Sequence, residues 1–118
     1  MTNWQPFDDG QSIGETGSEC GRIVRDEEHE RGARITLEEG GVTAPWSITC
    51  GVYGWMVHTR FFSQREHAEA AIDPMKSAMD EVLAEASRIA GDDEDEAGYW
   101  RVAALCSAFV ERFPTGGP

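Results

Sequence analysis

Apolar and polar residues alternate with a period of two through the middle of the chain. In residues 33–39, three apolar side chains alternate with the polar residues Arg34, Thr36 and Glu38. Residues 46–62 are the most apolar and aromatic stretch, and Gly54 lies between its two arms, 46–52 and 55–62. Such alternation is typical of half-buried strands, and a glycine between two arms is typical of a hairpin turn. The pattern therefore predicts three strands, the last two joined as a β-hairpin.

The length of the hairpin loop decides which side chains share a face of the sheet. A two-residue loop at Tyr53 and Gly54, or a four-residue loop over 51–54, gives the same two faces, whereas a three-residue loop would mix polar and apolar groups. We therefore expect a loop of two or four residues. One face then holds Trp46, Ile48, Cys50, Trp55, Val57 and Phe61. The other face holds Ser47, Thr49, Met56, His58 and Arg60.

The segments before the hairpin give weaker patterns. Residues 19–25 include two adjacent β-branched residues, and we interpret them as a first, edge-like strand. Residues 26–32 are charged and end in glycine, which predicts a connecting turn. Residues 1–18 are rich in Gly, Asp, Ser and Thr, which predicts a flexible N-terminal arm. We expect Trp4 and Phe7 to hold this arm against the domain.

After the hairpin, apolar residues recur at intervals of three and four, the period of amphipathic helices. Ser63 and Glu66 have the spacing of a capping box, so a helix is expected to start where the last strand ends. Proline inside a helix costs about 3 kcal/mol but is tolerated at the first helical position. Pro74 therefore predicts a short helix at 64–72, a kink or break, and a longer helix from Pro74 to about residue 90.

A last helix is predicted over residues 94–113, and the acidic run at 92–96 suits its N-terminal end. Together the elements predict an α+β fold in the order β-β-β-β-α-α. A four-stranded, mainly antiparallel meander packs one face against the C-terminal helices, which makes two layers. Residues 19–114 form a single domain, as the chain length of 118 residues also indicates.

The net charge is strongly negative, because 22 acidic residues outnumber 10 basic ones and give −12. Such a charge repels nucleic acids and anionic membranes, so we expect no binding to either. It favours solubility and, where there is a protein partner, a basic one. No apolar run approaches the roughly 20 residues that cross a bilayer, and residues 1–19 lack the pattern of a secretory signal. We therefore expect a cytoplasmic protein.

The polar face of the predicted hairpin is the strongest candidate for a ligand-binding site. It would bring together hydroxyl, imidazole and guanidinium groups from Ser47, Thr49, His58 and Arg60, with Arg34 and Thr36 on the neighbouring strand. Arginine presents a fork of donors that suits a carboxylate or phosphate, and histidine can change its charge near neutral pH. The alternative interpretation is the solvent-facing side of a one-sided sheet, which antiparallel sheets commonly have.

Signatures of catalysis or cofactor binding are weak. Cys50 lies near His58 in the sequence, but the predicted faces place them on opposite sides of the sheet, and buried thiols are far commoner than nucleophilic ones. The three histidines and three cysteines do not have metal-ligand spacing. The glycines in 10–17 follow no predicted strand and precede no lysine, unlike those of a phosphate-binding loop. We therefore predict no catalytic residue, no metal and no cofactor.

The predicted apolar faces do not account for the burial of all aromatic side chains. Those left over are Trp4, Phe7, Tyr53, Trp55 and Trp100. Aromatic side chains at a surface often anchor interfaces, which favours a homodimer. In the alternative interpretation they fill the open ends of the core.

Three functional hypotheses follow. The leading one is a small acidic binding or interaction module without catalytic activity, which binds a protein partner or a small ligand. The second is a small enzyme that uses His58, with Arg60 as a clamp for an anion. The third is an acidic neutraliser of a basic protein, comparable to an immunity protein or antitoxin.

Overall fold

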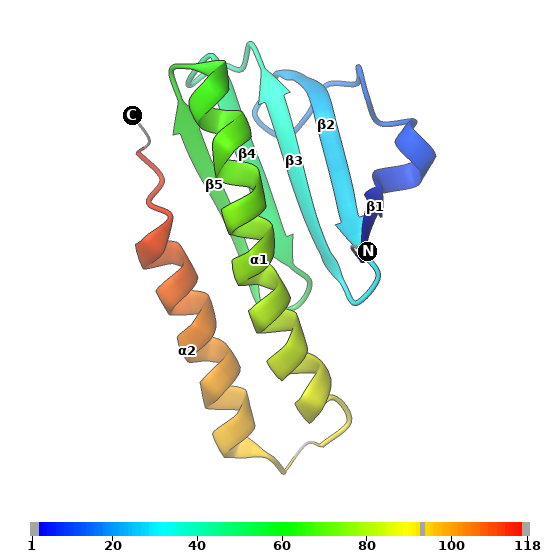
Figure 1. Cartoon of the computed structure of the whole chain (residues 1–118), viewed down its shortest axis with the longest axis vertical. Helices are drawn as coiled ribbons and strands as arrows, with labels where there is room; N and C mark the ends of the chain where they lie inside the picture. Colours follow the sequence, from blue (N-terminus) through cyan, green and yellow to red (C-terminus); the bar gives the residue numbers. More distant parts are fainter. Residues whose placement is uncertain (1–2, 93, 117–118) are drawn as a thin grey trace.

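Five antiparallel strands form one sheet, in which spatial neighbours are also neighbours along the chain (Figure 1). The computed structural model describes residues 3–92 and 94–116. The strands are β1 (Trp4–Pro6), β2 (Arg22–His29), β3 (Ala33–Glu39), β4 (Trp46–Val52) and β5 (Met56–Phe62). A short 3₁₀ turn, η1 (Phe7–Gly10), follows β1, and the helices α1 (Arg65–Ile89) and α2 (Glu96–Arg112) follow β5. This confirms the predicted α+β fold, with five strands instead of four.

The additional strand, β1, lies in the segment that was predicted to be an arm. Trp4 pairs with His29 at the edge of the sheet and is only 6% exposed. Its indole N–H donates a hydrogen bond to Asp80 of α1 at 3.0 Å, and the His29 ring packs against the indole with centroids 5.2 Å apart. Trp4 thus holds the N-terminal segment against the core, as expected. The strand escaped prediction because three residues are too few to show an alternating pattern.

Strand β2 runs further than predicted. It was expected over 19–25 with a charged turn at 26–32, but it continues to His29. Asp26 and His29, which looked like turn residues, are 3% and 4% exposed. Polar residues can occupy buried strand positions only where partners satisfy them, and those partners come from distant parts of the chain. Residues 26–29 were therefore predicted as part of a turn, because charged residues are not expected at buried strand positions.

Helix α1 crosses Pro74 without interruption, so the predicted break at this residue is wrong. Ile72, Met75 and Met79 flank the proline on one face of the helix and are at most 1% exposed. Burying a side chain of this size contributes about 1.5–3 kcal/mol. Three such side chains outweigh the roughly 3 kcal/mol that an internal proline costs. Packing against the sheet therefore decides the course of the helix.

The two helices begin in different ways. Helix α1 has Gln64, not Ser63, at its N-cap position, and the Gln64 side chain makes no capping hydrogen bond. At α2, the carboxylate of Asp95 accepts a hydrogen bond from the N–H of Gly98 at 2.8 Å, which confirms the predicted acidic cap. In residues 3–92 and 94–116, neither helix combines the length and the apolar character that crossing a membrane requires.

The β4–β5 hairpin has a three-residue loop, 53–55, which is the length that the sequence interpretation disfavoured. Val52 pairs with Met56, and the N–H of Trp55 donates to the carbonyl of Val52 at 2.9 Å. Gly54 has a φ of 81°, a conformation that glycine adopts readily. A shift of one residue exchanges the faces of a strand. The predicted faces of β5 are therefore wrong, because the helices are faced by Met56, His58, Arg60 and Phe62.

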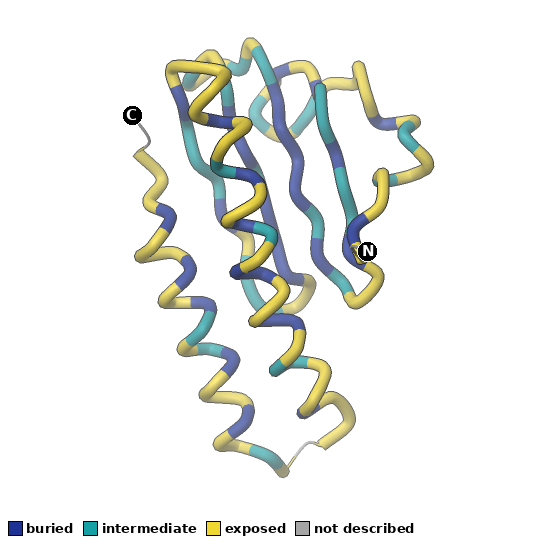
Figure 2. Tube along the Cα trace, in the orientation of Figure 1, coloured by how far each residue is buried: buried dark blue, intermediate teal, exposed yellow. Residues whose placement is uncertain are grey.

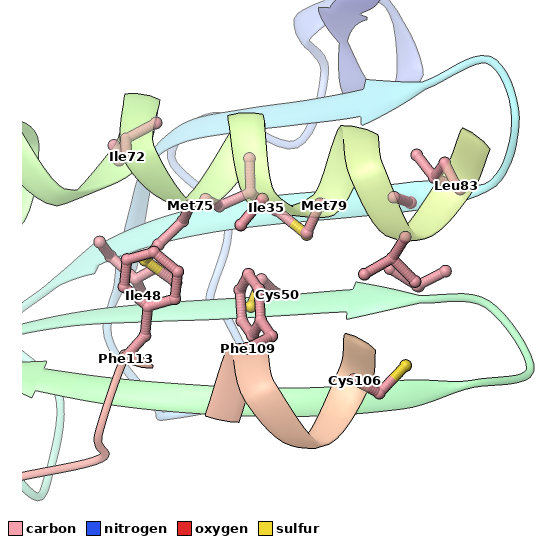
Figure 3. Close-up of a cluster of buried hydrophobic side chains, with 14 of the residues drawn as sticks. Ile35, Ile48, Cys50, Ile72, Met75, Met79, Leu83, Cys106, Phe109 and Phe113 are labelled. Atoms are coloured by element: carbon pink, nitrogen blue, oxygen red, sulfur yellow. The ribbon is translucent and has the colours of Figure 1, made fainter. Parts of the chain in front are cut away.

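The helix layer covers one face of the sheet (Figure 1). Helix α1 lies across the middle of the sheet, and α2 lies beside it on the side of β5. Buried residues recur along both helices at intervals of three to four, and most of the positions between them are exposed (Figure 2). The core between the layers is formed by residues such as Ile35, Ile48, Met75, Met79 and Phe109 (Figure 3).

One carboxylate lies between the sheet and α1. Glu27 of β2 accepts a hydrogen bond from Lys76 of α1 and another from Arg25, both at 2.7 Å. Burial alone would raise the pKa of Glu27, but the hydrogen bonds from Lys76 and Arg25 outweigh this effect and lower the pKa below its ordinary value. Glu27 therefore stays ionised at neutral pH and links β2 to α1.

Candidate ligand-binding site

The four residues predicted to bind a ligand do not lie together. Ser47 and Thr49 are on the open face of the sheet, which points away from the helices, whereas His58 and Arg60 point toward the helix layer. Thr49 pairs with Thr59 and His58 pairs with Cys50, so the prediction that Thr49 and His58 share a face is wrong. Ser47 is only 2% exposed, and its hydroxyl has no hydrogen-bond partner within the described residues.

His58 and Arg60 attach the segment after α2 to strand β5. The imidazole Nε2 of His58 lies 2.5 Å from the carbonyl oxygen of Phe113, and the Nε–H of Arg60 donates to the carbonyl of Pro114 at 3.2 Å. His58 is 8% exposed, and burial lowers the pKa of Arg60. Both side chains are engaged with backbone carbonyls, so this arrangement gives no support to an enzyme that uses His58 with Arg60 as an anion clamp.

The structure also changes the relation of Cys50 to His58. These two residues are direct cross-strand partners on the helix side of the sheet, so the predicted opposite placement is wrong. Cys50 is nevertheless 2% exposed, and burial raises the pKa of its thiol to about 12. A nucleophilic cysteine needs thiolate character and access to its substrate. Cys50 has neither and packs as a core residue.

On the open face, polar residues form a row across four strands. Each is the cross-strand partner of the next, and the row runs Asp26, Thr36, Thr49 and Thr59. The hydroxyl of Thr36 donates to Asp26 at 2.9 Å. The hydroxyl oxygen of Thr49 lies 3.4 Å from those of Thr59 and Ser18, and both distances are longer than the roughly 2.5–3.0 Å of ordinary hydroxyl hydrogen bonds. Both contacts of the Thr49 hydroxyl are therefore weak.

The N-terminal segment covers the β2–β3 half of this open face. The hydroxyl of Ser12 donates to Asp26 at 2.8 Å. The N–H of Gly14 donates to the carbonyl of Ile23 at 2.8 Å, and the N–H of Ile23 donates to the carbonyl of Glu15 at 2.9 Å. The solvent-facing sheet surface that the sequence suggested is therefore confined to the β4–β5 half.

Asp26 and Arg34 form the charged centre beneath this cover. The Asp26 side chain is fully buried and accepts two hydrogen bonds from Arg34, from Nε at 2.9 Å and from Nη2 at 2.7 Å. The Arg34 guanidinium lies over the ring of Phe7, with its carbon 3.5 Å from the ring centroid. The hydrogen bonds to Asp26 raise the pKa of Arg34. The charge of Arg34 is thus compensated within the protein.

A second buried carboxylate, Glu38, shapes the turn at residues 17–21. It is 1% exposed and accepts hydrogen bonds from the backbone N–H groups of Gly21 at 3.1 Å and Glu19 at 3.2 Å. The backbone at Gly17 lies directly against this carboxylate, because a Cβ there would be 2.3 Å from the Glu38 carboxyl carbon. A side chain at position 17 would displace the Glu38 carboxylate, whereas the glycine backbone covers it.

Between residues 15–18 and the hairpin loop lies a groove of about 830 Å³, here called the open-face groove. Its lining includes the hydroxyl-bearing residues Thr36 and Thr49, and the apolar residue Val57, which is 81% exposed. Tyr53 also lines the groove, and its hydroxyl donates to Glu28 at 2.7 Å. Burial and the hydrogen bond to Glu28 raise the pKa of Tyr53 to about 12, so the phenol stays uncharged at neutral pH.

The groove therefore offers a ligand hydroxyl groups, backbone groups and apolar surface, but no uncompensated cation. No group of three or more His, Cys, Asp and Glu side chains that could hold a metal occurs among the residues that the structure describes. Of the residues predicted for the ligand-binding face, Thr49 and its neighbours Arg34 and Thr36 line the groove, whereas Ser47, His58 and Arg60 do not.

Sequence reasoning missed the buried carboxylates Asp26 and Glu38 and the covering role of residues 12–21. The available signal was slight, since Glu38 follows the strand alternation and glycines occur at positions 17 and 21. Nothing local in the sequence shows that these distant positions meet. Comparison with protein-family models, curated proteins and solved structures finds no match to this chain, so its function has to be inferred from the geometry of the groove.

Proposed function

We propose that the chain is a small binding module without catalytic activity, whose open-face groove holds an uncharged ligand. The observation that supports this proposal is a groove of about 830 Å³ with threonine hydroxyls, an aromatic ring and an exposed valine along its lining. Ligand sites of this kind combine apolar walls with a few polar groups that orient the ligand. The groove suits a ligand with hydroxyl or amide groups on one side and a flat apolar surface on the other.

The charges around the groove disfavour an anionic ligand. Arg34 is the cationic side chain in the lining. It donates two hydrogen bonds to Asp26, whose negative charge compensates that of the guanidinium. Glu15 at the rim and the net charge of −12 make the surrounding potential negative. A phosphate or carboxylate would lose hydration without gaining a free cation. The proposal therefore keeps the predicted binding module and replaces the predicted anion site.

Nuclear magnetic resonance titration of the backbone amides tests this proposal. Uridine and methyl glucoside serve as uncharged probes, and inorganic phosphate and citrate serve as anionic ones. We expect at least one uncharged probe to shift the amide signals of Ser18, Thr49 and Gly51 in a saturable manner, and the anions to leave these signals in place.

A matched pair of variants links the signal to the groove. Thr49→Phe places a large ring in the groove and should abolish the shifts, whereas Thr43→Phe, on an exposed turn outside the groove, should not. Shifts caused only by phosphate or citrate, or shifts that persist in Thr49→Phe, would refute the proposed site. Absence of any shift with both uncharged probes would refute the proposed ligand class.

A further inference from the structure

Three aromatic rings meet on a second surface, between the hairpin loop and the start of α2. Trp55 of the loop contacts Tyr99 with ring centroids 5.2 Å apart, and Tyr99 contacts Trp100 edge-on, also at 5.2 Å. Tyr99 is 51% exposed and Trp100 is 61% exposed. Large aromatic side chains rarely leave so much surface in water unless it serves an interaction. This cluster is therefore the most conspicuous exposed apolar feature of α2.

Two of these rings, Trp55 and Tyr99, line a hollow of about 800 Å³, here called the aromatic cleft. The end of α1 adds apolar lining through Ala86, Ile89 and Ala90. The remaining lining residues are acidic and come from the connection between the helices and the first residue of α2, namely Asp92, Glu94, Asp95 and Glu96. The cleft thus combines exposed aromatic faces with a carboxylate rim.

The carboxylates of this rim are largely uncompensated. Within the described part of the chain, the side chains of Glu94 and Glu96 make no ion pair or hydrogen bond, and Asp95 approaches Arg88 only at 4.0 Å. Arg88 binds Glu85 at 2.6 Å, and Arg101 binds the same carboxylate at 2.8 Å. Asp95 caps α2, and Asp92 accepts a hydrogen bond from the N–H of Glu94 at 3.2 Å, so among the described residues Glu94 and Glu96 are the acids of the rim whose side chains have no such local role.

We propose that the aromatic cleft binds an arginine-bearing segment of a basic protein. A guanidinium can stack flat on the face of Trp or Tyr while its N–H groups donate to carboxylates. The cleft presents both partners side by side, and the net charge of −12 attracts a basic chain over a distance. A second copy of this chain would carry the same charge and be repelled. This inference goes beyond the open-face groove and does not depend on its ligand.

Isothermal titration calorimetry with a defined peptide tests the proposal. The probe alternates arginine with glycine over eight residues, and its counterpart carries glutamate in place of arginine. We expect saturable binding of the arginine peptide to the full chain and none of the glutamate peptide. Tyr99→Ala, which removes a ring that lines the cleft, should weaken the affinity about fivefold to tenfold. Val110→Ala, an exposed position on the same helix outside the cleft, should change it less than about twofold.

Charge variants separate the cleft from the net charge of the molecule. Replacing Glu94 and Glu96 by glutamine should weaken binding and reduce its salt dependence. The same change at Glu66 and Glu69, exposed near the start of α1, should have a much smaller effect. Thr49→Phe should leave peptide binding unchanged, so that failure of this proposal and failure of the groove proposal are distinguishable.

Three outcomes would overturn the inference: wild-type affinity in Tyr99→Ala, equal losses from the two glutamine pairs, or no binding of the arginine peptide at low salt. Circular dichroism verifies that Tyr99→Ala folds. If it does not, the backbone amide signal of Tyr99 in the unmodified chain is followed during peptide titration. A saturable shift of this signal then supports the cleft, and an unchanged signal overturns it.

Discussion

Replacing Arg34 by methionine should destabilise the protein strongly, although a third of the Arg34 side chain is exposed. The substitution removes two hydrogen bonds, of 2.9 and 2.7 Å, from the fully buried carboxylate of Asp26. A hydrogen bond to a charged group contributes about 1.5–3 kcal/mol. Solvent screening at the partly exposed guanidinium reduces the sum to about 2–4 kcal/mol, because exposed charges interact weakly. Ser12 and Thr36 continue to donate to Asp26 and prevent a larger loss.

Urea denaturation followed by tryptophan fluorescence measures this change in the free energy of unfolding. In thermal denaturation the same loss should lower Tm by about 8–16 °C, at about 4 °C per kcal/mol for a chain of this size. Arg22→Met is the matched control, since it breaks the exposed pair of Arg22 with Glu39 and should cost less than about 1 kcal/mol. Combining Arg34→Met with Asp26→Asn removes both charges and should be less destabilising than the sum of the single changes.

The reasoning would be refuted if Arg34→Met cost no more than Arg22→Met. It would also be refuted if the double variant were fully additive, since additivity would mean that Asp26 and Arg34 do not interact. A confirmed coupling would show that the Asp26–Arg34 pair, which lies beneath the N-terminal segment, contributes to the stability of the sheet.

Three further predictions concern other parts of the molecule. Gly98→Ala should cost about 1–3 kcal/mol in urea denaturation despite the helix propensity of alanine, because the added Cβ would lie 2.5 Å from the side chain of Ile89; equal stability would contradict this. In native protein a thiol reagent should label the exposed Cys20 and spare Cys50, whose buried thiol has a pKa of about 12, and labelling of all three thiols should require urea. The pKa of Glu27 is lowered in the folded state, so its stabilising contribution is complete above its ordinary pKa of 4.5 and is lost as the pH falls toward the lower folded value. Glu27→Gln should therefore flatten the decline of stability below pH 4.5, measured as Tm against pH, and an unchanged slope would contradict the assignment.

Much of the fold could be predicted from local patterns. Strands β3 and β4 have the predicted bounds because alternation with a period of two depends only on neighbouring residues. The amphipathic stripes that indicated the helices, and the acidic cap at Asp95, are equally local signals. The antiparallel order of the meander followed because short connections join successive strands. The prediction of an α+β fold survived the error in the hairpin loop, because two arms pair as a hairpin whatever the length of the loop.

The site could not be predicted in the same way. A loop of three residues, in place of the expected two or four, turned His58 and Arg60 from the open face to the helix side, where they bind carbonyls of the C-terminal segment. No pattern near position 58 carries the information that Phe113 supplies an acceptor there. Pro74 shows the same limit, because burial of its neighbours against a sheet outweighed a strong local preference.

By itself the sequence determined the acidic character, the class of fold and the faces of β3, because composition and periodicity are properties of short stretches. Only the tertiary structure decided which polar groups are buried and where a hollow remains. Ser12 meets Asp26, Glu19 meets Glu38 and Trp4 meets Asp80 across 14, 19 and 76 residues of chain. A buried charged group is tolerated only when the folded chain supplies a hydrogen-bond or ion-pair partner for it. The open-face groove and the aromatic cleft therefore exist only once the whole chain has folded.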